Sequence, residues 1–251
     1  MSTNNLIIVG DDYKSFAQQA GVFTVSAFYQ TMLDNQSWPD SNAQVILGQG
    51  IGYNDRDFIA NALAKRGVEN FHPIAPLASL QDTHKRTHEN VMITESRKLD
   101  RLAYEFDLTI TDKVDRLSDH VTGKHVGAML LMEAARQATI VVLEEAYSKI
   151  SGEKFSMVLD KFESKFEAYL FPLPTTLTTR IYEIKVSPKN ICVIVTSVVK
   201  QGRSEIATVS LDVTLCVSQT LDKIEERKAQ SAVRDFHQFF TVSHENQLDK
   251  V

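Results

Sequence analysis

The segment at residues 123–146, GKHVGAMLLMEAARQATIVVLEEA, constrains the fold of this chain more than any other part of the sequence. Its alanine, leucine, methionine and valine residues predict a helix that is apolar on nearly every side. Such a helix has to be covered on most of its surface, unlike the one-sided helix of a protein surface. Because a single sheet covers only one side, we expect a second copy of the chain to cover the rest, in a homodimer.

Three polar residues interrupt this apolar helix, which is predicted to run over about residues 127–150. Glu133 and Arg136 are three positions apart and Glu133 and Gln137 are four apart, so all three share one helix face. Two interpretations are open. The charges form an ion pair that serves only the structure of the core, or the polar face borders a functional site.

The segments on both sides of this helix have the pattern of strands. Apolar and polar side chains alternate along residues 101–112, which is typical of a half-buried strand. Further strand patterns occupy about residues 89–99, 155–170, 177–187, 190–201 and 204–218. This order predicts the α+β class, with one long helix wrapped by an antiparallel sheet.

The first 75 residues have a different pattern, that of a small α/β unit. Its predicted elements are strands at 5–9 and 43–48 and helices at 13–33 and 54–67. A segment containing Pro73 and Pro76 links it to the rest. We therefore expect a unit at 1–75, a wrapped-helix domain at 80–220, and a C-terminal helix and tail at 221–251.

Three glycines follow the second strand of this unit, at Gly48, Gly50 and Gly52. Dinucleotide-binding folds place glycines between a strand and a helix in the same way, but with the spacing G-x-G-x-x-G. Here the spacing is G-x-G-x-G, and no well-placed acid follows. The glycines are therefore interpreted as a tight turn that docks the unit against the rest of the chain.

Composition argues against several classes of function. The net charge of −5 argues against a nucleic-acid-binding surface, and no apolar run approaches the roughly 20 residues that span a bilayer. The N-terminus lacks the positive charge of a signal peptide, so we expect a cytoplasmic protein without membrane contact. Cys192 and Cys216 lie in strand patterns and are interpreted as small buried residues, with no metal site expected.

Two motifs resemble those of the A-factor biosynthesis hotdog family, which makes γ-butyrolactone signal precursors in secondary metabolism. The first is THKRTHENVMIT at 83–94, and the second is DHVTGKHVGAMLLMEAARQA at 119–138. The resemblance covers about residues 80–218. It implies a hotdog fold, in which a curved antiparallel sheet wraps a central helix. The chain departs from the family in the Pro-Gly pair expected before the helix, and it contains one hotdog unit where many members have two.

The resemblance implies acyl transfer from an acyl-carrier protein or CoA thioester to the hydroxyl of a phosphorylated acceptor such as dihydroxyacetone phosphate, without a cofactor. The implied catalytic residues are Glu89 as general base or as the group that orients the hydroxyl, Arg136 on the phosphate or carbonyl, Glu133, and His125 in the loop before the helix. The implied substrate-binding residues are His84, Lys85, Gln137, Asp119, His120 and Gly127. A complete site would then need groups from two subunits.

Other interpretations stay open at this point. The chain could also be a hotdog thioesterase or a hydroxyacyl-thioester dehydratase; the dehydratases of fatty-acid synthesis likewise place a histidine in this loop and an acidic residue on this helix. A third alternative is a non-catalytic acyl-binding protein. Asp119 and His120 also fit an ordinary surface turn. The basic run at 84–86 fits either a solvated patch or a site for one phosphate.

Overall fold

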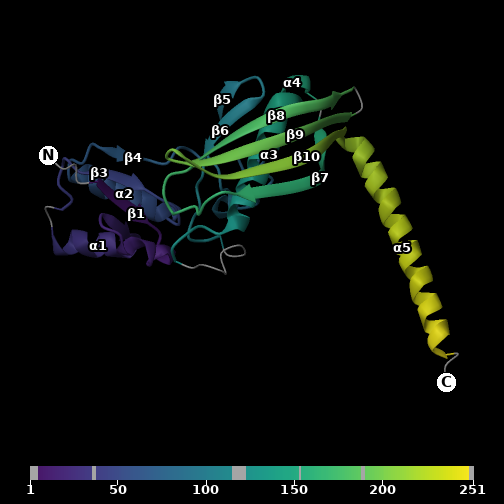
Figure 1. Ribbon diagram of the computed structural model, residues 1–251, viewed down its shortest axis with the longest axis horizontal. Helices are drawn as coiled ribbons and strands as arrows, with labels where there is room; N and C mark the ends of the chain where they lie inside the picture. The colour runs from purple at the N-terminus through teal and green to yellow at the C-terminus, as the bar shows by residue number, and fades with distance from the viewer. Residues whose placement is uncertain (1–4, 36–37, 115–122, 153, 188–189, 249–251) are drawn as a thin grey trace.

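The computed structural model describes residues 5–35, 38–114, 123–152, 154–187 and 190–248, with side chains to residue 239. Asp119 and His120 lie outside the described residues. Figure 1 shows an N-terminal α/β unit beside a larger domain built around helix α3, and a long C-terminal helix α5 that leaves the body. No helix in the described part of the chain is long and apolar enough to cross a membrane.

The larger domain contains a six-stranded sheet in the order β5-β6-β8-β9-β10-β7. Its strands are β5 (Arg97–Asp100), β6 (Ala103–Asp107), β7 (Phe155–Phe166), β8 (Thr176–Val186), β9 (Asn190–Gln201) and β10 (Ser204–Val217). Every neighbouring pair is antiparallel. The sheet curves around α3 (Figure 1), so the predicted α+β class and the arrangement of one helix wrapped by an antiparallel sheet are confirmed.

Helix α3 (Ala128–Leu143) follows the N-cap residue Gly127 and continues into a π-helical turn η4 (Glu144–Ser148) and the short α4 (Lys149–Ser151). Gly152, at φ 70°, ends it in the left-handed conformation that glycine adopts without strain. Eleven of the sixteen residues of α3 are buried, so nearly the whole helix is covered within one chain. Val91, Met92 and Ile93 join its core cluster and cover the side away from the sheet.

The part of α3 that remains open is a narrow strip near its N-terminus. Ala128 is exposed and Met129 keeps 55% of its surface, while Met132, Glu133 and Arg136 are only partly buried. The expectation that a second copy must cover a whole side of the helix is thus too broad. A partner would have to cover only this strip, because the segment before β5 shields the rest.

The N-terminal unit is a parallel sheet in the order β2-β1-β3-β4. Its elements are β1 (Asn5–Val9), η1 (Asp11–Tyr13), η2 (Phe16–Gln18), β2 (Val22–Thr24), α1 (Val25–Asp34), β3 (Gln44–Leu47), α2 (Tyr53–Lys65) and β4 (Phe71–His72). The predicted continuous helix at 13–33 is wrong. Gly21 turns the chain at φ 78°, and the β-branched Val22 and Thr24 then pair with β1.

Two further boundaries differ from the sequence-based expectation. The predicted strand at 89–99 is instead a 3₁₀ turn, η3 (His88–Asn90), two isolated bridges through Ile93 and Thr94, and then β5. The C-terminal helix α5 runs over Ser218–Leu248, beyond the predicted 220–240. The first difference arises because contacts with Leu77 and Leu108 decide the conformation at residues 93–94. The second lies in a helix that leaves the body, and it concerns only where the helix ends.

The turn that follows β3 docks the N-terminal unit onto the larger domain. Gln49 is buried, accepts a hydrogen bond from the Ile110 amide at 2.8 Å and donates to the carbonyls of Leu108 and Leu173 at 3.1 and 3.3 Å. A Cβ atom on Gly48 would lie 2.1 Å from the Pro172 carbonyl oxygen, so only glycine fits there. The contacts agree with the docking interpretation of the three glycines.

We expect Gln49→Leu to lower the free energy of unfolding by about 2–4 kcal/mol, because it leaves buried backbone groups without their partner. Chemical denaturation checks this, and limited proteolysis should show earlier cleavage between the two units. The control is Gln18→Leu, which makes the same change at an exposed position of the same unit. Equal stability of the two variants would contradict the docking role of Gln49.

Candidate active site

The polar residues of α3 form a compact cluster with Lys85. The Glu133 carboxylate accepts two hydrogen bonds from Arg136, from Nε to Oε2 and from Nη2 to Oε1, both at 2.8 Å. It also accepts from Lys85 Nζ at 2.5 Å and from Gln137 Nε2 at 3.0 Å. The structure therefore brings together four of the predicted site residues, from two segments about 50 positions apart in the sequence.

Gln137 connects this cluster to the segment that covers α3. Its side chain is fully buried, accepts from the Met92 amide at 2.9 Å and donates to the Asn90 carbonyl at 2.9 Å. A buried amide with both ends satisfied stabilises one arrangement of the chain, since any shift would leave a polar group unpaired. Gln137 therefore fixes residues 90–92 against the helix.

Lys85 reaches the cluster through a tight turn. The amide of His84 donates to the Gln81 carbonyl at 3.2 Å, and the amide of Lys85 donates to the Leu80 carbonyl at 2.9 Å. This hydrogen-bond pair is the Schellman motif, which needs a left-handed residue at the position of His84. His84 has φ 53°, an uncommon conformation for a residue other than glycine. Its predicted role was substrate binding, but its backbone is what turns Lys85 towards Glu133.

Charge in the cluster favours an anionic ligand. Burial would raise the pKa of Glu133, but the hydrogen bonds from Arg136, Lys85 and Gln137 outweigh it and hold the pKa at about 2. Glu133 is therefore ionised at neutral pH, where it holds its cations in place and cannot release a proton. Two cations and one carboxylate leave a net charge of +1 on a surface that is partly open to solvent.

Glu89 lies next to the segment that Gln137 fixes against α3. Its carbonyl accepts from the Thr111 hydroxyl at 3.3 Å, and its neighbour Asn90 is bound by Gln137. Tyr53 of α2 holds the same segment, because its hydroxyl donates to the His88 carbonyl at 2.7 Å. Burial raises the pKa of Tyr53, while the charge of Arg56 lowers it and that of Glu89 raises it.

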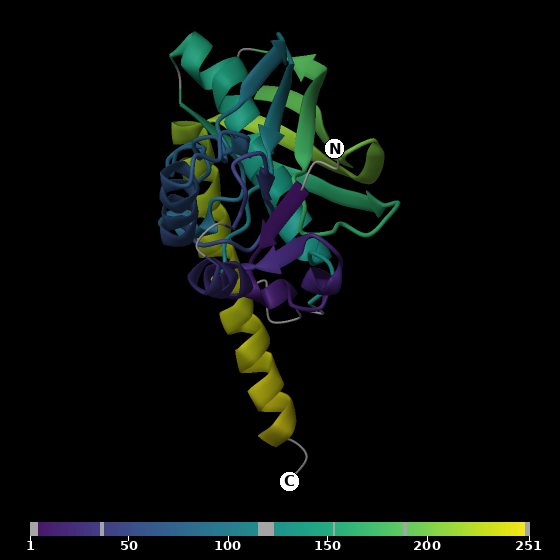
Figure 2. The same ribbon diagram turned by 90° about the vertical axis from the view of Figure 1, so that its left-hand side faces the viewer.

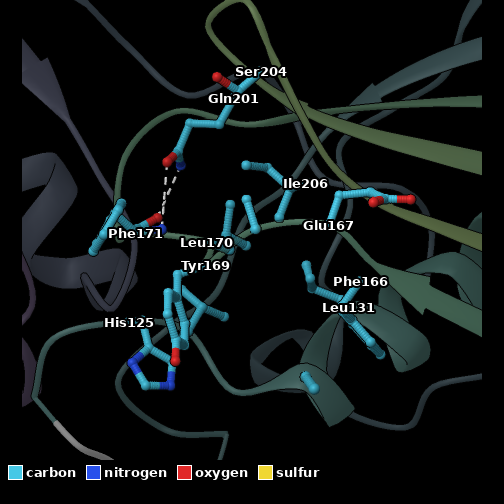
Figure 3. Close-up of a pocket in the computed structure, with 13 residues that line it drawn as sticks. His125, Leu131, Phe166, Glu167, Tyr169, Leu170, Phe171, Gln201, Ser204 and Ile206 are labelled. Carbon is cyan, nitrogen blue, oxygen red and sulfur yellow. Dashed lines mark hydrogen bonds between the residues drawn. The ribbon is translucent and has the colours of Figure 1, made fainter.

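A cavity of about 700 Å³ opens at the N-terminus of α3. Figure 3 shows His125 and Tyr169 side by side at one end, with their ring centres 5.0 Å apart. Most of the other lining side chains are apolar: Val126, Ala128, Leu131, Phe166, Leu170, Phe171 and Ile206, with Glu167, Gln201 and Ser204 on the polar side. Gln201 donates to the Phe171 carbonyl at 2.9 Å, which fixes the loop that forms this wall (Figure 3).

The cavity and the polar cluster lie at the same end of α3 but on different sides of the helix. Ala128 and Leu131 line the cavity, and Glu133 lies less than two turns farther along α3. Leu131 and Glu133 are two positions apart, so their side chains point to nearly opposite sides of the helix. Gly127 precedes the first helical turn with no side-chain cap, and the space beside its Cα is open. The first N–H groups of the helix, which have no acceptor within it, face this region.

Comparison with known proteins then identifies the fold family. The family model of the A-factor biosynthesis hotdog domain matches residues 72–221, well over half of the chain. The chain belongs to this family. A comparison with curated protein sequences found no match.

The similarity of this chain to solved structures is low. A mutant thioesterase from Pseudomonas aeruginosa is 10% identical over 55% of this chain and 94% of its own, with a TM-score of 0.40. A conserved protein from the same organism is 11% identical over 48% and 86%, with a TM-score of 0.37. A mutant thioesterase from Staphylococcus aureus is 11% identical over 49% and 92%, with a TM-score of 0.37.

The A-factor hotdog match contains every predicted site residue, and it leaves out most of the N-terminal unit and nearly all of α5. Sequence analysis missed Tyr169, Phe171 and Gln201 of the cavity wall. The aromatic and proline run at 169–174 is the signal that points to them, because prolines hold a loop in one conformation. The described residues hold no group of three His, Cys, Asp or Glu that could bind a metal ion.

Because the pKa of Glu133 is lower in the folded chain, the free energy of unfolding should decrease at low pH. The pKa is about 2 in the folded chain and 4.5 without the fold, so the carboxylate stabilises the fold fully above pH 4.5. That stabilisation is lost as the pH falls from 4.5 through 2, and it amounts to about 3 kcal/mol. We expect Glu133→Gln to lower the free energy of unfolding at pH 7 and to flatten its dependence on pH below 4.5.

Urea denaturation at a series of pH values measures this effect. Glu226→Gln, on the exposed surface of α5, is the control and should keep the slope of the parent protein. A Glu133→Gln variant that loses stability in acid as steeply as the parent would contradict the assignment.

The turn at His84 gives a separate prediction. His84→Gly should raise the free energy of unfolding by about 1 kcal/mol, because glycine adopts the left-handed conformation without a steric cost. His84→Val should lower it by at least about 1 kcal/mol, since a β-branched residue fits this conformation poorly. Thermal denaturation of the two variants checks the order, and a reversed order would contradict the role of the turn.

Proposed function

We propose that this A-factor biosynthesis hotdog protein is an acyltransferase. It transfers a β-ketoacyl group from an acyl-carrier-protein or CoA thioester to the hydroxyl of a phosphorylated acceptor such as dihydroxyacetone phosphate. The observation that carries the proposal is a polar cluster with a net charge of +1 on the same helix whose N-terminus borders an apolar cavity. The two halves of the substrate pair need these two environments.

The cavity fits the acyl chain and the thioester. Its volume of about 700 Å³ is within the usual range for a small-molecule site, and its aromatic and aliphatic lining favours an alkyl chain. The N-terminus of α3 would place backbone N–H groups at the thioester carbonyl oxygen. These donors stabilise the negative charge that develops on that oxygen during attack, and the helix dipole adds to the effect.

The polar cluster fits the phosphate of the acceptor. Arg136 donates to Glu133 through Nε and Nη2, so its Nη1 is left for a ligand. Lys85 Nζ is bound to Oε1 of the same carboxylate. Glu133 and Gln137 then serve as positioning residues, because they hold the two cations in one geometry. Paired cations bind phosphate oxygens by charge-assisted hydrogen bonds.

The reaction needs a base for the acceptor hydroxyl. His125 lines the cavity, and imidazole is the side chain that most often acts as a general base, so we assign it this role. We assign Glu89, the neighbour of Asn90, the orientation of the acceptor hydroxyl. The hydroxyl oxygen bonds to the thioester carbon while His125 takes its proton. The carbon–sulfur bond then breaks, and the thiolate leaves with the proton that His125 returns.

We further propose that the protein is a homodimer formed along β7. This strand is twelve residues long and lies at the edge of the sheet, an arrangement that favours pairing with another strand. Antiparallel addition of a second β7, with the strand ends matched, places Asp160 opposite Lys161 of the partner. A bulge at Asp160 falls at the symmetry axis, so each half of one strand pairs with the other half of its partner.

Mass spectrometry of the product formed from a β-ketoacyl-CoA and dihydroxyacetone phosphate tests the function. We expect an acyl ester of the acceptor. Arg136→Gln should raise the KM for the phosphorylated acceptor by about tenfold to a hundredfold, with a small effect on the KM for the thioester. His125→Ala should lower kcat by about 10²–10⁴-fold.

Arg101→Ala is the matched control, because Arg101 forms an exposed ion pair with Glu183 on another part of the sheet. Release of free acid with no acceptor would identify a thioesterase, and hydration of an enoyl thioester would identify a dehydratase. Thioester binding without any turnover would identify an acyl-binding protein. Each of these results would overturn the proposed transfer.

A further inference from the structure

We infer that helix α5 of one protomer borders the acyl cavity of its partner and completes the wall that a single chain leaves open. The inference rests on the proposed function, from which it takes the dimer along β7 and the cavity as the acyl site. Its evidence is the position of α5 and of the cavity at the two ends of the same edge strand.

Helix α5 starts next to the N-terminal end of β7. The amide and hydroxyl of Ser218 donate to the Lys154 carbonyl at 3.1 and 2.9 Å, and the Ser218 and Ser156 hydroxyls are 2.9 Å apart. These bonds fix the root of the helix beside Phe155, the first residue of β7. The start of α5 is therefore fixed next to the start of β7, and it keeps this position in a dimer in which two β7 strands pair.

The cavity lies at the other end of β7. Phe166, the last residue of the strand, lines the cavity together with Glu167, Ala168 and Tyr169. Twelve residues separate the two ends by about 40 Å, so α5 starts far from the cavity of its own chain. An antiparallel pair of β7 strands with matched ends brings Phe155 of one protomer beside Phe166 of the other. The root of each α5 then lies next to the cavity of the partner.

The direction of α5 agrees with this placement. Figure 1 shows α5 starting at the end of the sheet near β10 and β7 and leading away from it, beyond the edge that β7 forms. Figure 2 shows the same helix leaving the body in the perpendicular view. With 31 residues it spans about 46 Å, which is enough to cross the end of a partner's sheet.

Both surfaces carry exposed apolar side chains. Along α5, Ala229, Val233 and Phe236, with Ala232 and Phe239 beside them, form one stripe. The stripe lies about 16–31 Å from Ser218 along the helix, so it can meet only the part of the partner's cavity rim that lies away from the end of β7. Val233, Phe236 and Phe239 are 58, 62 and 69% exposed in a single chain. At the cavity rim, Phe166, Tyr169 and Phe171 are 42, 69 and 40% exposed. Contact between the two sets removes both from water.

Photo-crosslinking tests the contact without any substrate. The reactive amino acid p-benzoylphenylalanine replaces Tyr169, and isotopically heavy and light chains are mixed to form dimers. We expect heavy-to-light adducts between position 169 and residues 218–239 of the partner. The same amino acid at Tyr182, which is exposed on the outer face of the sheet, is the control and should give no adduct with α5.

Substitutions on α5 test the consequence for the cavity. Phe236→Asp should lower the yield of the crosslink at least fivefold and raise the Kd for an acyl-CoA at least tenfold. Gln238→Asp puts the same charge on the opposite face of the same turn, and it should change neither quantity. Both positions are exposed, so the folded body should be intact in both variants, which circular dichroism checks.

The outcomes separate this inference from the proposed function. Adducts confined to one chain, adducts to other segments only, or a monomer at all concentrations would overturn the role of α5. Acyl transfer that survives such a result would leave the proposed function standing. Adducts to α5 in a protein that transfers no acyl group would support the contact and refute the transfer.

Discussion

The arrangement of this molecule depends on one carboxylate, that of Glu133, inside the wall of an otherwise apolar helix. Burial alone would disfavour its charge, yet the hydrogen bonds from Arg136, Lys85 and Gln137 keep the pKa at about 2. The charge in turn fixes three groups that belong to different parts of the chain. Gln137 also binds the backbone at Asn90 and Met92, so residues 90–92, which cover α3, cannot move without leaving polar groups unpaired.

Gln49 has a similar role at the junction between the two units, because it is a buried polar side chain whose hydrogen bonds fix the backbone around it. Strand order 2-1-3-4 in a parallel sheet leaves a crevice at the carboxyl ends of β1 and β3, where open α/β folds bind ligands. In this chain that crevice is filled by the backbone at Leu108, Ile110 and Leu173, which Gln49 binds. Gly48, beside Gln49, allows the backbone after β3 to lie close to the backbone at Pro172. This explains why a glycine pattern that resembles a nucleotide turn has no nucleotide geometry around it.

Local pattern was sufficient for much of the fold and for only part of the site. The strands β7 to β10 and helix α3 follow from alternation and from apolar spacing, which neighbouring residues determine. The helix expected at 13–33 failed because Val22 to Thr24 pair with β1, a contact that no local pattern contains. Glu133, Arg136 and Gln137 share a face by helical spacing alone. The approach of Lys85 depends on the left-handed turn at His84, and the cavity depends on segments up to about 80 residues apart, so neither is visible in local spacing.

Water is the remaining constraint on the chemistry. In one chain the cavity is open, Met129 and Tyr169 are exposed, and bulk water would compete with any acceptor hydroxyl for the acyl group. Water also weakens the attraction between the pair of cations and a phosphate, because Coulomb energy falls with the local dielectric constant. A partner that covers the open strip of α3 and the cavity rim would exclude water from both places at once. Under the proposed function, transfer in preference to hydrolysis requires that water be excluded, and the surfaces left open in a single chain are where a second copy would have to exclude it.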